Sequence, residues 1–278
     1  MSFRQACAAI VPEPLKPALR KLYYSVADRM ELLLGRRDAL TPPKRMWGLV
    51  TSPDLDFREM GEGLRQFLVE KGGLKPHETV LDVGCGIGRN AVPLIGRVRE
   101  YYGFDIMPDA IRWCQKNITR SHPNFHFHLA DVYNKAYNPK GRRSASEYRF
   151  PYPDGKFDLV FLVSVFTHML YGDVANYLSE IARVLRPGGR CVISFLLLND
   201  ESRRQMAAGT GAFDFKFKLG DCYAQNGENP EAAVAYDEER VRGLYEECRL
   251  TIKEPILYGT WSTSKAQVQD IVIAFKDE

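Results

Sequence analysis

Hydrophobic and polar positions follow two different periods across the middle of the chain. Residues 79–83 and 157–163 are short apolar runs with the length of buried strands, and residues 125–129 alternate as a half-buried strand does. Between such runs, apolar residues recur every three or four positions, as on residues 174–185, which is typical of amphipathic helices. This order predicts a parallel sheet with helices on both faces, joined by right-handed crossovers.

The end of the chain breaks this alternation. Residues 250–258 and 267–275 are strand-like, and only a short link joins them. A parallel pair would need a crossover of about a dozen residues, so we expect antiparallel neighbours. The predicted fold class is α/β, with a doubly wound, seven-stranded, mostly parallel Rossmann-like sheet whose last strand is antiparallel.

Three regions differ in character. We expect residues 1–77 to form an N-terminal helical cap or extension, and residues 78–278 the main domain with an insertion at 199–236 after the fifth strand. An apolar stripe at helical spacing in the first region comprises Leu15, Leu19, Leu22, Val26, Met30 and Leu33. We favour a helix packed on the core; a lid and a helix lying on a membrane surface are the alternatives.

Charge and composition narrow the classes of function. The chain has 278 residues, with Lys+Arg 38, Asp+Glu 35 and a net charge of +3, which gives no strong signal for nucleic-acid binding. No apolar run approaches the ~20 residues of a membrane span, and none near the start suits a secretory signal. Six scattered cysteines without metal-ligand spacing indicate reduced thiols, no metal site and a cytoplasmic protein.

The strongest motif is VLDVGCGIGRN at residues 80–90, where a strand ends in Asp82 and glycines follow at 84, 86 and 88. Glycines allow a ligand to approach the backbone, and amides at the start of a helix expected over 90–98 would favour an anionic group. The spacing is G-x-G-x-G and differs from the G-x-G-x-x-G of dinucleotide-binding proteins.

Acidic residues follow the next two strands. Asp105 and Asp131 join Asp82 at the carboxyl ends of neighbouring strands, where open α/β sheets bind ligands. A single Asp there is more often a turn or cap residue. Three beside a glycine loop indicate a nucleoside site, in which Asp105 accepts hydrogen bonds from ribose hydroxyls and Asp131 from an adenine amino group.

With these features, residues 80–198 resemble the class I S-adenosylmethionine-dependent methyltransferases. The segments that carry the resemblance are VLDVGCGIGRN, YYGFDIMPDAIRWC, HLADVYN, FPYPDGKFDLVFLVSVFTHM and RVLRPGGRCVISF. The resemblance implies S-adenosylmethionine as the cofactor and methyl transfer as the activity. In such a reaction the cofactor supplies the reactivity and the protein supplies alignment.

The resemblance also implies how the methionine part of the cofactor would be held. The glycine loop, Gly84, Cys85 and Gly86, would surround it. Asp82 and the main-chain carbonyl of Ser164 would lie near its amine, and Arg89 would lie near its carboxylate.

The nucleoside part would lie further along the same edge. By the same resemblance, Asp105 would hold the ribose and Ile106 would lie against the adenine. Asp131 and the Val132 amide would bind the polar edge of the adenine.

His168 is the candidate general base. It follows the fourth strand, near the point where the methyl group would emerge, and an imidazole titrates near neutrality. The alternative, and the commoner role for such a histidine, is packing or capping at the start of the next helix.

These observations favour methyl transfer to a small-molecule or sugar-containing acceptor, at oxygen because His168 would be a base. Ser164-Val165-Phe166-Thr167 does not match the Asn/Asp-Pro-Pro-aromatic tetrad of enzymes that methylate exocyclic base nitrogens. The alternatives are a regulatory or non-methylating module that binds S-adenosylmethionine and an RNA methyltransferase. The acceptor identity and the oligomeric state stay open.

Three additions to the fold are candidates for the acceptor side. Trp47 would sit over the mouth of the site. The segment 134–149 carries Arg142 and Arg143, either on a solvated loop or against an anionic substrate. The alternating residues 213–219 predict a strand with one apolar face, which, with Trp261, would line a substrate pocket or cover core.

Overall fold

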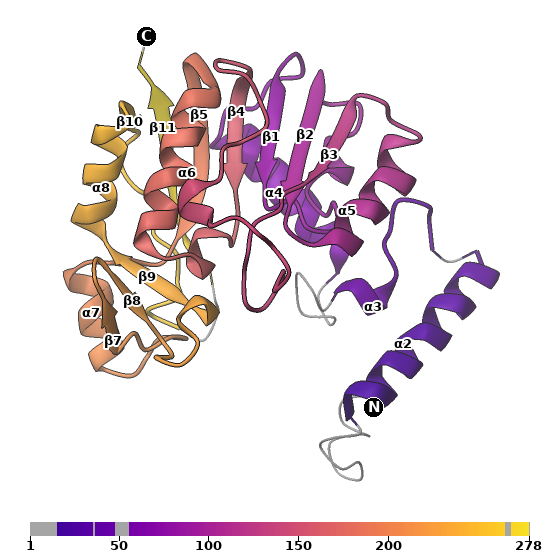
Figure 1. The fold of residues 1–278 in the computed structure, drawn as a ribbon, viewed down its shortest axis with the longest axis horizontal. Coiled ribbons are helices and arrows are strands. Elements are labelled where there is room, and N and C mark those ends of the chain that lie inside the picture. The colour runs from indigo at the N-terminus through magenta and orange to yellow at the C-terminus, as the bar shows by residue number, and fades with distance from the viewer. Residues whose placement is uncertain (1–15, 36, 48–55, 265–267, 278) are drawn as a thin grey trace.

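The computed structural model describes residues 16–35, 37–47, 56–264 and 268–277. Its centre is a seven-stranded sheet (Figure 1). In spatial order the strands are β10 (Leu250–Ile252), β11 (Asp270–Lys276), β5 (Leu185–Phe195), β4 (Phe157–Leu162), β1 (Thr79–Val83), β2 (Glu100–Asp105) and β3 (Phe125–Leu129). Strands β1 to β5 run parallel, and β11 is antiparallel to both neighbours. The predicted fold class is therefore confirmed, including the antiparallel last strand.

Helices cover both faces of this sheet. Helices α6 (Tyr171–Val184) and α8 (Glu238–Glu247) pack on one face, and α4 (Phe57–Glu70) and α5 (Pro108–Cys114) pack on the other. In Figure 1, α6 lies in front of the sheet and α4 behind it. Strand residues alternate between the two cores: Leu81 belongs to the core under α6, and its neighbour Val80 to the core under α4.

The helix expected over residues 90–98 does not form. Only a 3-10 turn, η2 (Val92–Leu94), follows the glycine loop. Pro93 has no N–H to continue an α-helical ladder, and Gly96 has a φ of 72°. Helix α4 packs tightly here instead, since a Cβ on Gly61 would lie 2.5 Å from the carbonyl oxygen of Arg89. The expected helix N-terminus behind the loop is thus a wrong prediction.

A second, four-stranded sheet occupies residues 197–237. Its strands, in spatial order, are β6 (Leu197–Leu198), β9 (Val234–Asp237), β8 (Cys222–Ala224) and β7 (Phe217–Leu219), with helix α7 (Asp200–Ala207) beside them. The strand expected over 213–219 is wrong in extent: Phe217 is exposed, and Phe215 packs against the buried Trp261. Trp261 donates its indole N–H to Asp270 and is buried in this small core.

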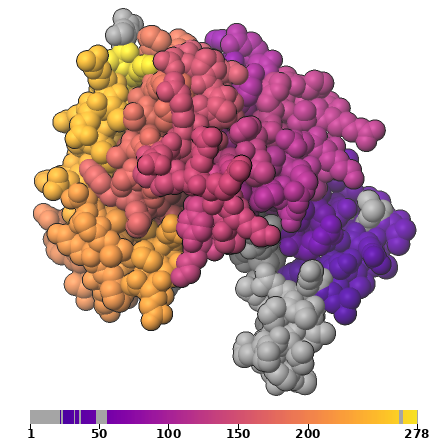
Figure 2. Space-filling model, in the orientation of Figure 1, coloured from indigo at the N-terminus to yellow at the C-terminus, as the bar shows by residue number. Residues whose placement is uncertain are grey.

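The N-terminal region is helical, but it is arranged differently from the prediction. Trp47, at the end of α3 (Lys44–Trp47), is buried against Phe57 and donates its indole N–H to the Pro42 oxygen. It therefore belongs to the core under α4, not to the mouth of a site. Helix α2 (Lys16–Leu33) lies on the outside of the molecule (Figures 1 and 2).

The apolar stripe of α2 is exposed, so the expected packing on the core is wrong for the residues that can be judged. Leu22 is 61% exposed and Leu33 81% exposed, and Val26 and Met30 are also exposed. Leu15 lies outside the described residues, as does the side chain of Leu19. The helix is held instead by its polar face, through Asp28 and Glu31.

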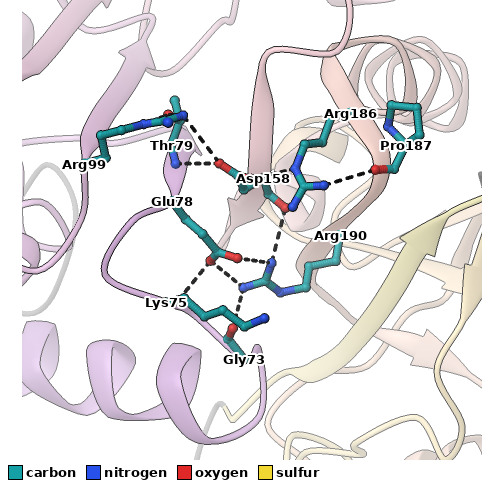
Figure 3. Close-up of polar contacts among 9 residues, drawn as sticks. All are labelled: Gly73, Lys75, Glu78, Thr79, Arg99, Asp158, Arg186, Pro187 and Arg190. Carbon is teal, nitrogen blue, oxygen red and sulfur yellow. Dashed lines mark hydrogen bonds and ion pairs between the residues drawn. The ribbon is translucent and has the colours of Figure 1, made fainter.

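A buried ion pair lies at the end of the sheet opposite the carboxyl ends of the parallel strands (Figure 3). Arg190 of β5 binds both carboxylate oxygens of Glu78, at 2.9 and 2.7 Å, and also the Gly73 carbonyl oxygen at 2.7 Å. The Arg190 and Glu78 side chains are 8% and 3% exposed. The pair therefore ties the turn after α4 to the starts of β1 and β5.

We expect Glu78→Gln to lower the free energy of unfolding by about 3 kcal/mol, because it leaves the Arg190 guanidinium buried without a counter-charge. Urea unfolding measures this value. The matched control is Glu201→Gln, which removes an exposed partner of Arg204 and should leave stability unchanged. Equal stability of the two variants would contradict a structural role for the buried pair.

Candidate functional site

The carboxyl ends of β1, β2 and β4 open onto one cavity of about 830 Å³. Its size lies in the range of small-molecule and cofactor sites. The predicted residues that line it are Gly84, Cys85, Gly86, Arg89, Asp105, Ile106, Val132, Arg142, Arg143, Ser164 and His168. Two further predicted residues, Asp82 and Asp131, are not part of the lining.

The glycine loop turns because its glycines adopt left-handed backbone angles. Gly84 and Gly88 have φ values of 80° and 76°. A Cβ on Gly84 would lie 2.3 Å from Val165 Cγ2, and one on Gly88 would lie 2.6 Å from Ile118 Cδ1. These two glycines therefore make room for the protein's own side chains as well as for the turn.

The amides of the loop are already used within the fold. Gly84 and Cys85 donate to the Phe104 carbonyl oxygen at 2.9 and 3.1 Å, and Gly86 donates to Asp105 Oδ2 at 2.8 Å. A phosphate site needs such N–H groups free to face the ligand. The helix whose first amides were expected to favour an anionic group does not form, and these three loop amides are not free to bind one.

Asp105 fixes the end of β2 and also faces the cavity. Besides Gly86, its carboxylate accepts from the Met107 amide at 2.9 Å. Burial raises the pKa of Asp105, and hydrogen bonds from main-chain amides oppose that rise. A carboxylate has about four acceptor positions, so these bonds leave capacity for a ligand hydroxyl.

Asp82 lies below the loop with one oxygen unused. Its Oδ2 accepts from the Tyr101 hydroxyl at 2.7 Å and from Asn90 at 3.5 Å. Its Oδ1 is buried and has no hydrogen-bond partner within the described part of the chain. Burial raises the pKa of Asp82 to about 7, and Arg89 nearby opposes the rise. A buried acceptor without a donor fits a ligand amine, directly or through water.

The acid after β3 faces the neighbouring insertion. Asp131 accepts from the main-chain N–H of Arg142 at 3.1 Å and from Arg142 Nε at 2.7 Å, which lowers the pKa of Asp131. Arg142, which was a candidate for an anionic substrate, is thereby paired. Val132 lines the cavity. On either side of it, the Asp131 carbonyl accepts from the Arg143 amide and the Tyr133 amide donates to the Arg143 carbonyl.

Ser164 ends β4 in a strained turn. It has a φ of 58°, uncommon for a residue other than glycine. Its N–H donates to Ser194 Oγ at 2.8 Å, and its own Oγ accepts from Gln269 at 3.0 Å. These bonds hold the turn that leads into η5 (Phe166–His168), which carries the candidate base.

His168 is half-buried in the cavity wall. Its Nδ1 lies 2.9 Å from the main-chain oxygen of Glu231, and its ring packs against that of Tyr137 at an interplanar angle of 69°. Because a carbonyl oxygen only accepts, Nδ1 carries the hydrogen in neutral His168. Nε2 then has a free lone pair, which is the state that a general base requires.

Glu231 and Asn134 are two of the lining residues that the sequence did not indicate. Glu231, on η6 (Pro230–Ala232) beside the second sheet, accepts from Asn134 Nδ2 at 3.1 Å. Asn134 also accepts from the amides of Ala136 and Tyr137, which closes a turn in the insertion after β3. This contact joins two insertions 97 residues apart over the cavity. The turn closed by Asn134 could be predicted from the sequence, because asparagine is a common turn residue. Nothing in the sequence predicts the contact with Glu231.

No cluster of three or more metal-ligating side chains occurs within the described ranges. Three features therefore define the site. They are a glycine loop whose amides are bonded within the protein, the buried Asp105 at the end of β2, and the Asp82 oxygen that has no hydrogen-bond donor. This combination on a Rossmann-like sheet defines a domain that binds a nucleoside-type cofactor without phosphate contacts at the loop.

Comparison with known proteins identifies the family. Residues 81–193 match the family described as methyltransferase domain. Together with the fold, this match shows that these residues form a class I S-adenosylmethionine-dependent methyltransferase domain, as the motifs predicted. S-adenosylmethionine, the predicted cofactor, is the methyl donor of this family.

Curated relatives are similar over part of their length. The tRNA N(3)-cytidine methyltransferase METTL2 of Gallus gallus is 25% identical over 183 residues, covering 64% of this chain and 44% of that protein. The 27-O-demethylrifamycin SV methyltransferase of Amycolatopsis mediterranei is 32% identical over 125 residues, covering 45% of this chain and 41% of that protein. The chain thus spans less than half the length of these relatives.

Solved structures show the same fold. PH0226 from Pyrococcus horikoshii superimposes with a TM-score of 0.55 at 17% identity, covering 82% of this chain and 93% of that one. The magnesium protoporphyrin IX methyltransferase of Synechocystis, solved with bound SAH (S-adenosylhomocysteine), gives a TM-score of 0.50 at 19% identity, covering 79% and 83%.

The raised pKa of Asp82 predicts a pH-dependent stability. Native Asp82 keeps its proton up to about pH 7, whereas the unfolded chain loses it near the ordinary aspartate pKa of 3.8, so stability falls as pH rises through this window. Asp82→Asn removes this loss. Relative to the unmodified protein, the variant should gain up to about 3 kcal/mol between about pH 4.5 and 7.5.

Urea unfolding across this pH range measures the effect. Asp109→Asn is the matched control, because the Asp109 side chain is 75% exposed. If Asp82→Asn and the unmodified protein show parallel pH profiles, Asp82 does not hold a proton in the native state.

Proposed function

We propose that the chain transfers the methyl group of S-adenosylmethionine to a hydroxyl of a small-molecule or sugar-containing acceptor. The observation that carries the choice of oxygen is the position of His168, whose Nε2 is available in the cavity that Asp105 and the glycine loop also line. When bound, S-adenosylmethionine supplies a methyl group already activated by its sulfonium charge.

The residues of the loop and of β2 would hold the cofactor. Asp105 offers acceptor capacity to the ribose hydroxyls, and Ile106 lies beside it for the adenine. The Val132 amide would bind the polar edge of the adenine. Asp131 would bind there as well only if its hydrogen bonds to Arg142 were broken.

The methionine part would lie along the glycine loop. The main chain of Gly84, Cys85 and Gly86 would surround it, the unpaired oxygen of Asp82 would receive its amine, and Arg89 would approach its carboxylate. Ser164 lines the same cavity, and its main-chain carbonyl would be the second acceptor for the amine.

His168 would act on the acceptor. Its Nε2 would take the proton of the acceptor hydroxyl as the oxygen–methyl bond forms, while Nδ1 keeps its hydrogen bond to the Glu231 carbonyl. That carbonyl stabilises the resulting imidazolium and fixes the ring, so the base stays aligned.

The lining near His168 suits a hydroxylated acceptor. Tyr137, Asp173 and Glu231 face the same cavity, and burial raises the pKa of both carboxyl groups. Such side chains accept hydrogen bonds from hydroxyls. Two of the three are acidic, which disfavours a polyanionic acceptor at this side of the cavity.

The similarity to METTL2 makes an RNA acceptor the second candidate. RNA binding through phosphate contacts would weaken steeply as salt rises. A salt titration with a tRNA mixture distinguishes the two, because a small-molecule acceptor predicts no such binding.

We expect Asp105→Ala to weaken binding of S-adenosylhomocysteine about a hundredfold, because hydrogen bonds from the ribose to a charged acceptor are lost. Isothermal titration calorimetry measures the affinity, with Asp109→Ala as the exposed control. Asp105 also fixes the loop, so Asp105→Asn, which keeps one acceptor oxygen, serves as a milder variant with an intermediate loss. Unchanged affinity in both Asp105 variants would remove the ribose role.

We expect His168→Gln to lower turnover by about 10²–10⁴-fold without changing the affinity for S-adenosylhomocysteine. Turnover is followed as conversion of S-adenosylmethionine to S-adenosylhomocysteine in a fractionated small-molecule metabolite extract. His126→Gln is the control, since His126 pairs with Glu100 on the edge strand. Binding without any conversion by the unmodified protein would favour the non-methylating module instead.

A further inference from the structure

Helix α2 presents an apolar face that the described parts of the chain do not cover. Leu22, Val26, Met30 and Leu33 are between 51% and 81% exposed, and Leu34 directly after the helix is also exposed. They recur at three- and four-residue spacing, so they form one continuous stripe along the helix. Exposed apolar stripes of this kind mark surfaces that bind another molecule.

The opposite, polar face of α2 is the one that attaches it to the protein. Asp28 is buried and accepts from the Lys44 amide at 2.6 Å, and its carboxylate pairs with Arg45 and Arg37. Glu31 pairs with Lys44 at 2.6 Å. These contacts set the rotation of the helix, and they leave the stripe exposed to solvent.

The segment that carries the stripe has a basic composition. Residues 16–37 hold six Lys/Arg and two Asp/Glu, a formal +4 that exceeds the +3 of the whole chain. Both acids are the inward-facing Asp28 and Glu31. Arg29 is exposed and follows Leu22 by seven residues, or two turns, so it lies within the stripe.

We propose that α2 docks, stripe first, on the surface of an anionic lipid bilayer. Apolar residues would enter the interface while basic residues pair with headgroups, as in interfacial amphipathic helices. A second copy of the chain fits less well, because a two-fold contact through the stripe would bring two such basic segments together. No helix within the described ranges is long and apolar enough to cross a bilayer.

Vesicle flotation with the full chain tests this surface, and it does not rest on the proposed methyl transfer. The probes are vesicles of phosphatidylcholine alone and of phosphatidylcholine with about one third phosphatidylglycerol. We expect binding to the anionic vesicles, weak binding to the neutral ones, and a loss of binding as salt rises.

Variants then assign the binding to the stripe. Combining Leu22→Ser with Leu33→Ser should lower partition into anionic vesicles by about tenfold or more. Val69→Ser, an exposed apolar position on α4, should not change it. Arg29→Gln should weaken binding to anionic vesicles about fivefold and leave binding to neutral vesicles unchanged.

Three results would overturn the proposal: no binding of the unmodified chain to anionic vesicles, unchanged binding of the double Leu variant, or self-association through the stripe. Sedimentation velocity without lipid detects the last of these, as a dimer that the double variant abolishes.

Discussion

The cavity depends on how the end of β2 holds the glycine loop. The Phe104 carbonyl and the Asp105 carboxylate accept hydrogen bonds from three successive loop amides, those of Gly84, Cys85 and Gly86. These bonds fix the loop against β2, and they also remove the donors that a phosphate would need. These hydrogen bonds therefore shape the site and also favour a ligand that needs no anion-binding amides at the loop. A cofactor that carries a sulfonium and an amine is such a ligand.

The acceptor side depends on contacts between distant parts of the chain. Glu231, carried by the second sheet, receives the Nδ1 hydrogen of His168 on its carbonyl and binds Asn134 of the insertion through its carboxylate. His168 and two walls of the cavity are thus positioned by one residue. A separate contact, the buried Glu78–Arg190 pair, joins elements at the opposite end of the sheet (Figure 3).

Local patterns predicted the elements where one face is buried, because burial imposes a period on the sequence. These local patterns gave wrong predictions where contacts with other segments determined the structure. Residues 90–98 have helical periodicity, yet Pro93 and the close approach of Gly61 leave only a short turn. Residues 213–219 alternate as a strand does, yet Phe215 turns into a small core under Trp261 that belongs to another segment.

The sequence by itself determined the sheet, its antiparallel end, the methyltransferase domain and most of the predicted residues that line the cavity, because strand ends and glycine turns are local features with a fixed place in this fold. Only the tertiary structure decided that Asp131 is paired with Arg142, that His168 faces the cavity with a defined hydrogen position, and that α2 turns its apolar stripe outward. Each of these depends on partners that the spacing of residues along the chain does not encode.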